Sequence, residues 1–155
     1  MDPYFLVKTL HIISSTILFG TGIGIAFFML WANFKGDLAI KAYAAQTTVF
    51  ADFLFTTPAV IIQPVTGVIL IKLAGYDFSE HWLILTYILY AIAGLCWLPV
   101  VWIQIKLRDV AVKALRSREE LPAEYYKLFK MWFILGWPAF ISLVIIFFLM
   151  VTKPS

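Results

Sequence analysis

The sequence predicts an all-α protein, an integral membrane bundle of four helices that forms one domain over residues 1–155. Its composition is 63% hydrophobic and only 14% charged, which is too little polar surface to cover a soluble domain. Four apolar runs are each long enough to cross the roughly 30 Å hydrocarbon core as a helix, which satisfies its own backbone hydrogen bonds. The lipid bilayer is therefore an expected partner. We expect the spans at about residues 5–34, 47–71, 82–105 and 131–151.

The first run, residues 5–34, contains no Asp, Glu, Lys or Arg after Lys8. The start Met-Asp-Pro-Tyr lacks the basic region and the cleavage site of a signal peptide, so we expect this span to be retained. At helical spacing, Lys8, His11 and either Ser14 or Ser15 share one face. These polar side chains predict that this face contacts something other than lipid.

Glycines are concentrated in the second half of the first run. Gly20-x-x-x-Gly24 overlaps with Gly22-x-x-x-Ala26, and small residues at this spacing let helices approach closely. We therefore expect the first helix to pack centrally, and the alternative is that the same pattern docks a planar cofactor. Later runs contain further small residues, Gly94, Gly136 and Ala139.

The second run, residues 47–71, contains Pro58 and Pro64. Each proline removes a backbone donor and displaces the carbonyl four residues earlier, at Leu54 or Val60, so this helix should bend. We expect the freed groups to be capped by polar side chains of the same run, Thr56, Thr57 and Gln63.

Asp52 lies on the inner half of the second run, where an unpaired carboxylate is costly. Lys106 and Arg108, at the inner end of the third run, are its expected partners in a structural ion pair. The alternative role of Asp52 is in a proton relay. Gln63 and Gln104 are expected to form hydrogen bonds between helices.

The third run, residues 82–105, continues into a charged, amphipathic stretch that reaches residue 130 and is broken at Leu121-Pro122. Proline suits the first turn of a new helix, so the third and fourth helices should protrude from the bilayer. The single cysteine, Cys96, excludes an internal disulfide and a Cys-x-x-Cys-His attachment of c-type haem.

Positive charges predict the orientation of the bundle. They gather in the connections after the first and third runs, whereas the opposite side has only Lys8, Lys72 and Lys153. Because Lys and Arg are in excess on the cytoplasmic side, both termini should face outward. The net charge of +3 therefore reports orientation and does not indicate nucleic acid. The basic residues on the inner side are Lys35, Lys41, Lys106, Arg108, Lys113, Arg116, Arg118, Lys127 and Lys130.

His11 lies about two turns inside the outer end of the first run, and an ionisable group in hydrocarbon marks a candidate site. Its imidazole could ligate haem iron or another metal ion, or relay a proton; the alternative is a neutral histidine bonded to a helix carbonyl. His81 and Met150 are candidate second ligands, because His/His and His/Met pairs both hold haem. Otherwise His81 is an interfacial residue and Met150 fills the core or faces lipid. The expected cofactor is b-type haem near the outer face.

Several blocks of sequence resemble the bacterial predicted integral membrane proteins catalogued as domain of unknown function 2269. They are Asp52-Phe-Leu-Phe-Thr-Thr-Pro through Gly67, Cys96-Trp-Leu-Pro through Gln104, Gly136-Trp-Pro-Ala139 and the ending Leu149 to Pro154. This resemblance covers nearly the whole chain and implies a bacterial inner-membrane protein, without implying an activity. More remotely, Lys8-x-x-His11-Ile-Ile is similar to the first helix of membrane protoporphyrinogen oxidases of the HemJ type, which implies haem at His11. The four-helix layout is similar to copper-uptake proteins of the CopD type.

Three functions stay open. The first is electron transfer or haem handling, with the protein tuning the iron through ligand identity and burial. The second is a cofactor-free interaction or assembly subunit, in which Lys8, His11 and Asp52 fix the helix register. The third is a carrier of a small solute or metal, with the proline-broken second helix and Gln63 lining a midplane site. The candidate protein partners are a second copy of the chain or a membrane redox protein, and enzymatic activity is left open.

Overall fold

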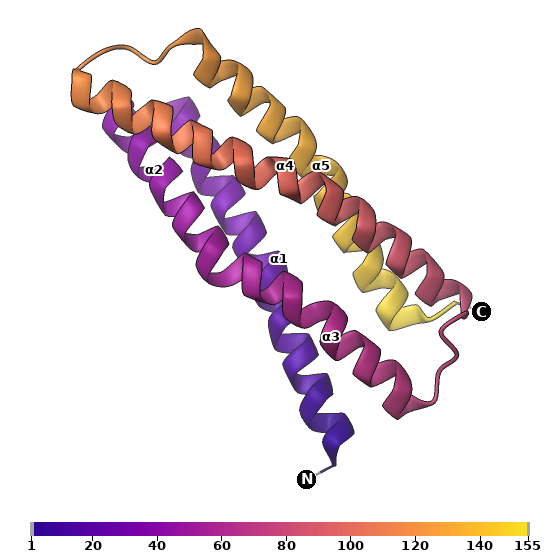
Figure 1. Cartoon of the computed structure of the whole chain (residues 1–155). Coiled ribbons are helices and arrows are strands. Elements are labelled where there is room, and N and C mark those ends of the chain that lie inside the picture. The colour runs from indigo at the N-terminus through magenta and orange to yellow at the C-terminus, as the bar shows by residue number, and fades with distance from the viewer. Residues whose placement is uncertain (1, 155) are drawn as a thin grey trace.

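The computed structural model describes residues 2–154, and these are helical with no strand among them. The elements are α1 (Pro3–Lys35), α2 (Leu38–Ala51), the π turn η1 (Asp52–Thr56), α3 (Thr57–Ala74), α4 (His81–Ser117) and α5 (Ala123–Thr152). α2, η1 and α3 follow one another without a break. They form one of the four apolar helices that are long enough to cross a membrane (Figure 1). The predicted all-α membrane bundle is confirmed.

Polar residues at the helix ends set the boundaries. The Asp2 carboxylate accepts a hydrogen bond from the Tyr4 amide at 2.9 Å at the start of α1, and Asp37 does the same for Ile40 at the start of α2. Gly75, with φ 72°, ends α3 in the left-handed conformation that glycine adopts without strain. Pro122 lies immediately before α5, so the predicted helix start is displaced by one residue.

Except for α1, the membrane helices extend well beyond the expected spans. The expected spans come from the apolar runs, and these runs cover only the part of each helix that lies in lipid. The connections α1–α2 and α4–α5 lie at one end of the bundle, and the N-terminus, C-terminus and α3–α4 connection lie at the other (Figure 1). Most of the large side chains between these ends are exposed, such as Phe28 at 67% and Leu95 at 70%. In a bilayer these side chains contact the acyl chains.

Two clusters hold the ends of the bundle together. At the end with the α1–α2 connection, Met29, Leu107 and Tyr125 are fully buried, and the Tyr125 hydroxyl donates to Asn33 Oδ1 at 2.8 Å. At the other end, Ile71 and Trp82 pack with Leu83 and Leu149. Along the bundle α5 packs on α4, and α1 packs on α3. A cavity lies between these two helix pairs.

The π turn η1 ends two residues before Pro58. The Thr57 amide donates to the Asp52 carbonyl five residues earlier, and the Thr57 hydroxyl donates to the same oxygen at 3.1 Å. Pro64 lies inside α3, and the Val60 carbonyl that it frees accepts a hydrogen bond from the Tyr90 hydroxyl of α4 at 2.6 Å. The predicted caps at the freed carbonyls of Leu54 and Val60 are therefore wrong. Within the described residues Thr57 bonds to the Asp52 carbonyl, Gln63 bonds to α1, and Tyr90 bonds to the Val60 carbonyl.

The glycines do not bring helices into close contact. A Cβ atom built on Gly20, Gly22, Gly24, Gly94 or Gly136 meets no atom of a neighbouring element within 4 Å. The expectation of close packing is therefore wrong at these positions. At Gly36, by contrast, a Cβ atom would lie 2.6 Å from the Ala32 carbonyl oxygen.

We predict that Gly20→Ala stabilises the protein by about 0.5–1 kcal/mol, because alanine restricts the unfolded chain and meets open space in the fold. Gly36→Ala is the matched control and should lower stability, since its Cβ collides with the backbone. Equilibrium unfolding in detergent measures both changes. A loss of stability in Gly20→Ala would mean that this glycine lies in a close helix contact after all.

Candidate functional site

A cavity of about 430 Å³ lies between α1, η1 and α3 on one side and α4 and α5 on the other. Its lining is mostly apolar and rich in large rings, which include Phe19, Tyr90, Trp97, Trp132, Trp137 and Phe140. Small-molecule sites in proteins typically have about 300–1,000 Å³ of space, apolar walls and a few polar groups. The volume and the lining both fit this description.

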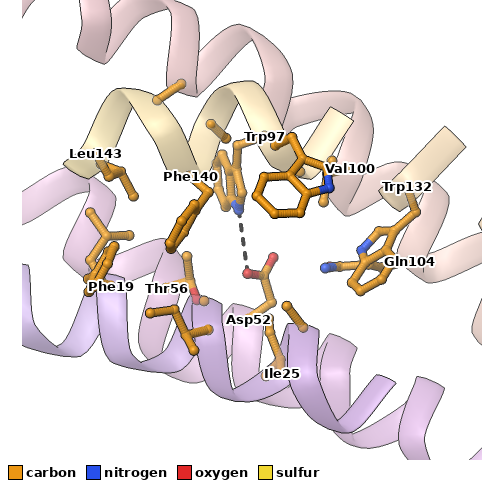
Figure 2. Close-up of a pocket in the computed structure, with 18 of the residues that line it drawn as sticks. Phe19, Ile25, Asp52, Thr56, Trp97, Val100, Gln104, Trp132, Phe140 and Leu143 are labelled. Carbon is orange, nitrogen blue, oxygen red and sulfur yellow. Dashed lines mark hydrogen bonds between the residues drawn. The ribbon is translucent and has the colours of Figure 1, made fainter. Parts of the chain in front are cut away.

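Three polar side chains line the cavity with an oxygen atom that has no hydrogen-bond partner among residues 2–154. These atoms are Asp52 Oδ2, Thr56 Oγ1 and Gln104 Oε1. Their side chains are almost fully buried, with exposed fractions of 2%, 4% and 3%. Figure 2 shows Asp52 and Gln104 pointing into the same space from opposite sides. Because buried polar groups are normally paired, three such atoms around one cavity indicate a site for a molecule with hydrogen-bond donors.

The π turn presents two of these residues. Asp52 is the first residue of η1 and Thr56 is the last. The two hydrogen bonds from Thr57 to the Asp52 carbonyl close this turn and thus determine where these two side chains lie. π turns within α-helices frequently occur at functional sites.

The expected ion pair of Asp52 with Lys106 or Arg108 is not formed. The Arg108 guanidinium pairs with Asp109 at 2.8 Å, and Lys106 Nζ lies 5.7 Å from the centre of the Trp102 ring. Lys106 follows Gln104 by two residues, which places it on nearly the opposite face of α4. The Asp52 carboxylate instead accepts a long hydrogen bond, 3.4 Å, from Trp97 Nε1 (Figure 2).

A second cluster of polar side chains, nearer the N-terminus, joins α1 to α3. Gln63 Nε2 donates to the His11 carbonyl at 2.8 Å and also to the Ser14 hydroxyl. The His11 ring contacts Thr66, with 2.7 Å between Nδ1 and Oγ1. Gln63 thus makes interhelical hydrogen bonds, and every one of its partners lies on α1. Unlike the cavity atoms, these groups satisfy one another.

The contacts of Thr66 favour one tautomer of His11. The Thr66 hydroxyl has one proton to donate, and it lies 2.7 Å from the Ile62 carbonyl and 3.2 Å from the Gln63 carbonyl. When that proton goes to a carbonyl, the hydroxyl accepts from His11 and the imidazole proton is on Nδ1. In this tautomer His11 Nε2 carries a free lone pair, and it has no hydrogen-bond partner in the described chain.

The residues proposed as haem ligands lie in three different surroundings. His11 contacts α3, His81 is exposed as the first residue of α4, and Met150 packs against the Trp82 cluster. Lys8 Nζ lies 5.3 Å from the centre of the Tyr4 ring and takes no part in the contacts of His11. Within residues 2–154, no group of three or more His, Cys, Asp or Glu side chains could hold a metal ion.

The aromatic lining was not predicted from the sequence. Trp97 and Trp137 lie inside apolar runs, whereas tryptophan in membrane proteins is typical of the interface with water. That position was a usable signal, and so was Tyr90, whose hydroxyl needs a partner within the membrane.

The model of the family described as "Predicted integral membrane protein (DUF2269)" matches residues 5–154. No curated protein and no solved structure matches the chain. The remote resemblances to the HemJ and CopD types therefore gain no support from these comparisons. The four membrane-spanning helices and the match over nearly all of the sequence agree, and the chain belongs to the DUF2269 family of predicted integral membrane proteins.

Proposed function

We propose that this integral membrane protein binds and carries a small, mainly apolar molecule in the cavity between its helix pairs. The observation that carries the proposal is the set of three unpartnered oxygens, on Asp52, Thr56 and Gln104, around an apolar space of about 430 Å³. Leaving a buried polar group unpaired costs about 1–3 kcal/mol. A bound molecule that donates hydrogen bonds to these atoms recovers that free energy.

The prolines support a carrier in preference to a fixed binding site. Pro64 lies inside α3, Pro99 inside α4 and Pro138 inside α5, and the π turn interrupts the same span as Pro64. Prolines and π turns are the usual places where a membrane helix bends. Each helix that contributes one also lines the cavity. These positions allow the helix pairs to tilt relative to each other around a bound molecule.

We predict that small lipophilic compounds raise the thermal stability of the wild-type protein and not of Gly94→Leu. Gly94 lines the cavity and a Cβ atom there meets open space, so we expect a leucine side chain to occupy the site. A compound at 100 times its Kd stabilises the fold by about 2.7 kcal/mol, and each kcal/mol raises Tm by about 2–4 °C. The measurement is a thermal shift in lipid nanodiscs with a compound panel.

Gly20→Leu is the matched control, since Gly20 also faces open space but does not line the cavity. This variant should respond to compounds as the wild type does. Equal responses of wild type and Gly94→Leu to every compound would overturn the binding function. Uptake of the bound compound into proteoliposomes then separates a carrier from a binding protein.

Haem binding through His11 is the second function that we propose, with a role in electron transfer or haem handling. It is supported by the contact of His11 Nδ1 with Thr66, because an imidazole whose Nδ1–H is bonded to an oxygen keeps Nε2 free for iron. His81 and Met150 lie elsewhere, so a second axial ligand would have to come from outside the cluster around His11.

We predict that the purified protein, after addition of haem, shows a Soret band that His11→Ala abolishes. Thr66→Val should weaken haem binding by about 10–100-fold, the usual effect of losing the partner of a metal-bound histidine. His81→Ala should leave the band unchanged. A protein that stays colourless with excess haem would rule out this function and favour a cofactor-free subunit.

We also propose that both termini lie on the outer side of the bacterial inner membrane. The support is the basic end of the bundle, where Lys35, Lys113 and Arg116 lie on the connections α1–α2 and α4–α5 or next to them. In a Cys96→Ala background, a membrane-impermeant maleimide should label Asp77→Cys in spheroplasts. It should label Glu119→Cys only after lysis, and the reverse pattern would invert the orientation.

A further inference from the structure

The Asp52 cavity combines an unpaired buried carboxylate with a lining of aromatic rings. From this combination we infer that the carried molecule is a lipophilic organic cation, a protonated amine on an aromatic or aliphatic body. The inference rests on the proposed function and specifies the class of molecule. It follows from three separate features, which are the hydrogen-bonding capacity of the free atoms, the distribution of charge and the nature of the lining.

The unpartnered oxygen atoms favour a bound molecule that carries hydrogen-bond donors. Asp52 Oδ2 and Gln104 Oε1 are acceptors, the Gln104 amide nitrogen that faces Asp52 in Figure 2 is a donor, and the Thr56 hydroxyl can both donate and accept. A molecule that satisfies both acceptors needs at least two donor hydrogens, and an ammonium group has up to three. An anionic molecule would instead place like charge against Asp52. The polar atoms therefore favour an amine over a carboxylate or a phosphate.

The distribution of charged side chains around Asp52 favours a positively charged bound molecule. Among the acidic residues of the described chain, Asp52 alone is buried. The basic side chains nearest to it along α4 are engaged elsewhere, Lys106 over Trp102 and Arg108 with Asp109. A carboxylate within the membrane is either protonated or paired with a countercharge, and no side chain of the described residues supplies that charge. A cationic molecule in the cavity provides that charge.

The lining suits the body of such a molecule and its charge. Trp97 and Phe140 lie on one side of the Asp52 carboxylate, and Trp132 lies beside Gln104 (Figure 2). The faces of aromatic rings attract cations, with tryptophan the strongest, and the effect grows when water is excluded. The Trp97 indole N–H donates to Asp52 Oδ1 and thereby fixes its ring next to the carboxylate. An ammonium group placed here would contact the carboxylate and a ring face together.

The test uses naphthalene compounds that differ only in the group at position 1. They carry aminomethyl, which is an ammonium at pH 7, or hydroxymethyl, methyl or carboxymethyl. Their affinities are measured by calorimetry with the full chain in nanodiscs of phosphatidylcholine, which has no net charge to concentrate cations. We expect the aminomethyl compound to bind at least tenfold more tightly than the methyl compound. The hydroxymethyl compound should fall between them, and the carboxymethyl compound should bind least.

Variants locate the effect. Asp52→Asn should weaken binding of the aminomethyl compound at least tenfold and leave the methyl compound unchanged, while Gly94→Leu abolishes both. Asp109→Asn removes an exposed carboxylate on the same helix and should change neither affinity. The compound series in the wild type needs no variant, so it tests the inference even if Asp52→Asn fails to fold.

The outcomes separate the two levels of proposal. If the hydroxymethyl or methyl compound binds as tightly as the aminomethyl compound, the inference that the molecule is a cation is wrong, whereas the proposed binding function stands. If the aminomethyl compound binds best but Asp52→Asn folds and retains that affinity, the assignment to this cavity is wrong. If no lipophilic compound in this series or in the thermal-shift panel binds the wild type, the proposed function fails and this inference fails with it.

Discussion

Inside hydrocarbon there is no water to bond a free backbone N–H or C=O, so each of these groups must find its partner within the protein. Pro58 and Pro64 break this requirement in the second span. The structure meets it for Pro64 with the Tyr90 hydroxyl, which donates to the Val60 carbonyl and ties α3 to α4 beside the cavity. Just before Pro58 the helix widens into the π turn, whose hydrogen bonds from Thr57 to the Asp52 carbonyl place Asp52 and Thr56 at the cavity. The site thus lies where the second span departs from regular α-helix.

The bundle contains two clusters of polar side chains, and they differ in whether their atoms find hydrogen-bond partners within the protein. On the α1–α3 side, Gln63, Ser14, His11 and Thr66 use one another as hydrogen-bond partners. The same chain therefore forms a satisfied intramembrane network. Around the cavity, Asp52, Thr56 and Gln104 each keep a free oxygen. Because these atoms are as deeply buried as Ser14, exposure to solvent does not explain the difference. The bound molecule that we propose would supply the missing partners.

Much of the fold follows from the apolar runs, because a span must be long and uncharged, and those properties are visible in sequence. Asp52 and Gln104 were also visible, since polar residues inside such runs are rare. The side chains that surround Asp52 and Gln104 in the fold could not be predicted from the sequence. Whether Lys106 reaches Asp52 depends on its face of α4 relative to Gln104 and on the competing ring of Trp102, which are tertiary facts. The π turn was hidden for a related reason. A proline shows that a hydrogen bond is lost, but the partner that replaces it can come from another helix, as Tyr90 does for Val60.

The glycines show that the open space is a property of the sequence and not a local packing accident. Gly22, Gly94 and Gly136 line the cavity from α1, α4 and α5, and a Cβ atom at each would meet nothing from neighbouring elements within 4 Å. Alanine at these positions would strengthen the helices, since glycine in a helix interior is less stable than alanine by about 0.5–1 kcal/mol. Larger apolar residues would add dispersion contacts across the gap as well. Three helices thus carry glycine, which stabilises a helix less than every residue except proline, where a side chain would fill the cavity. A bundle selected only for stability would have closed this space, so the volume itself argues for an occupant.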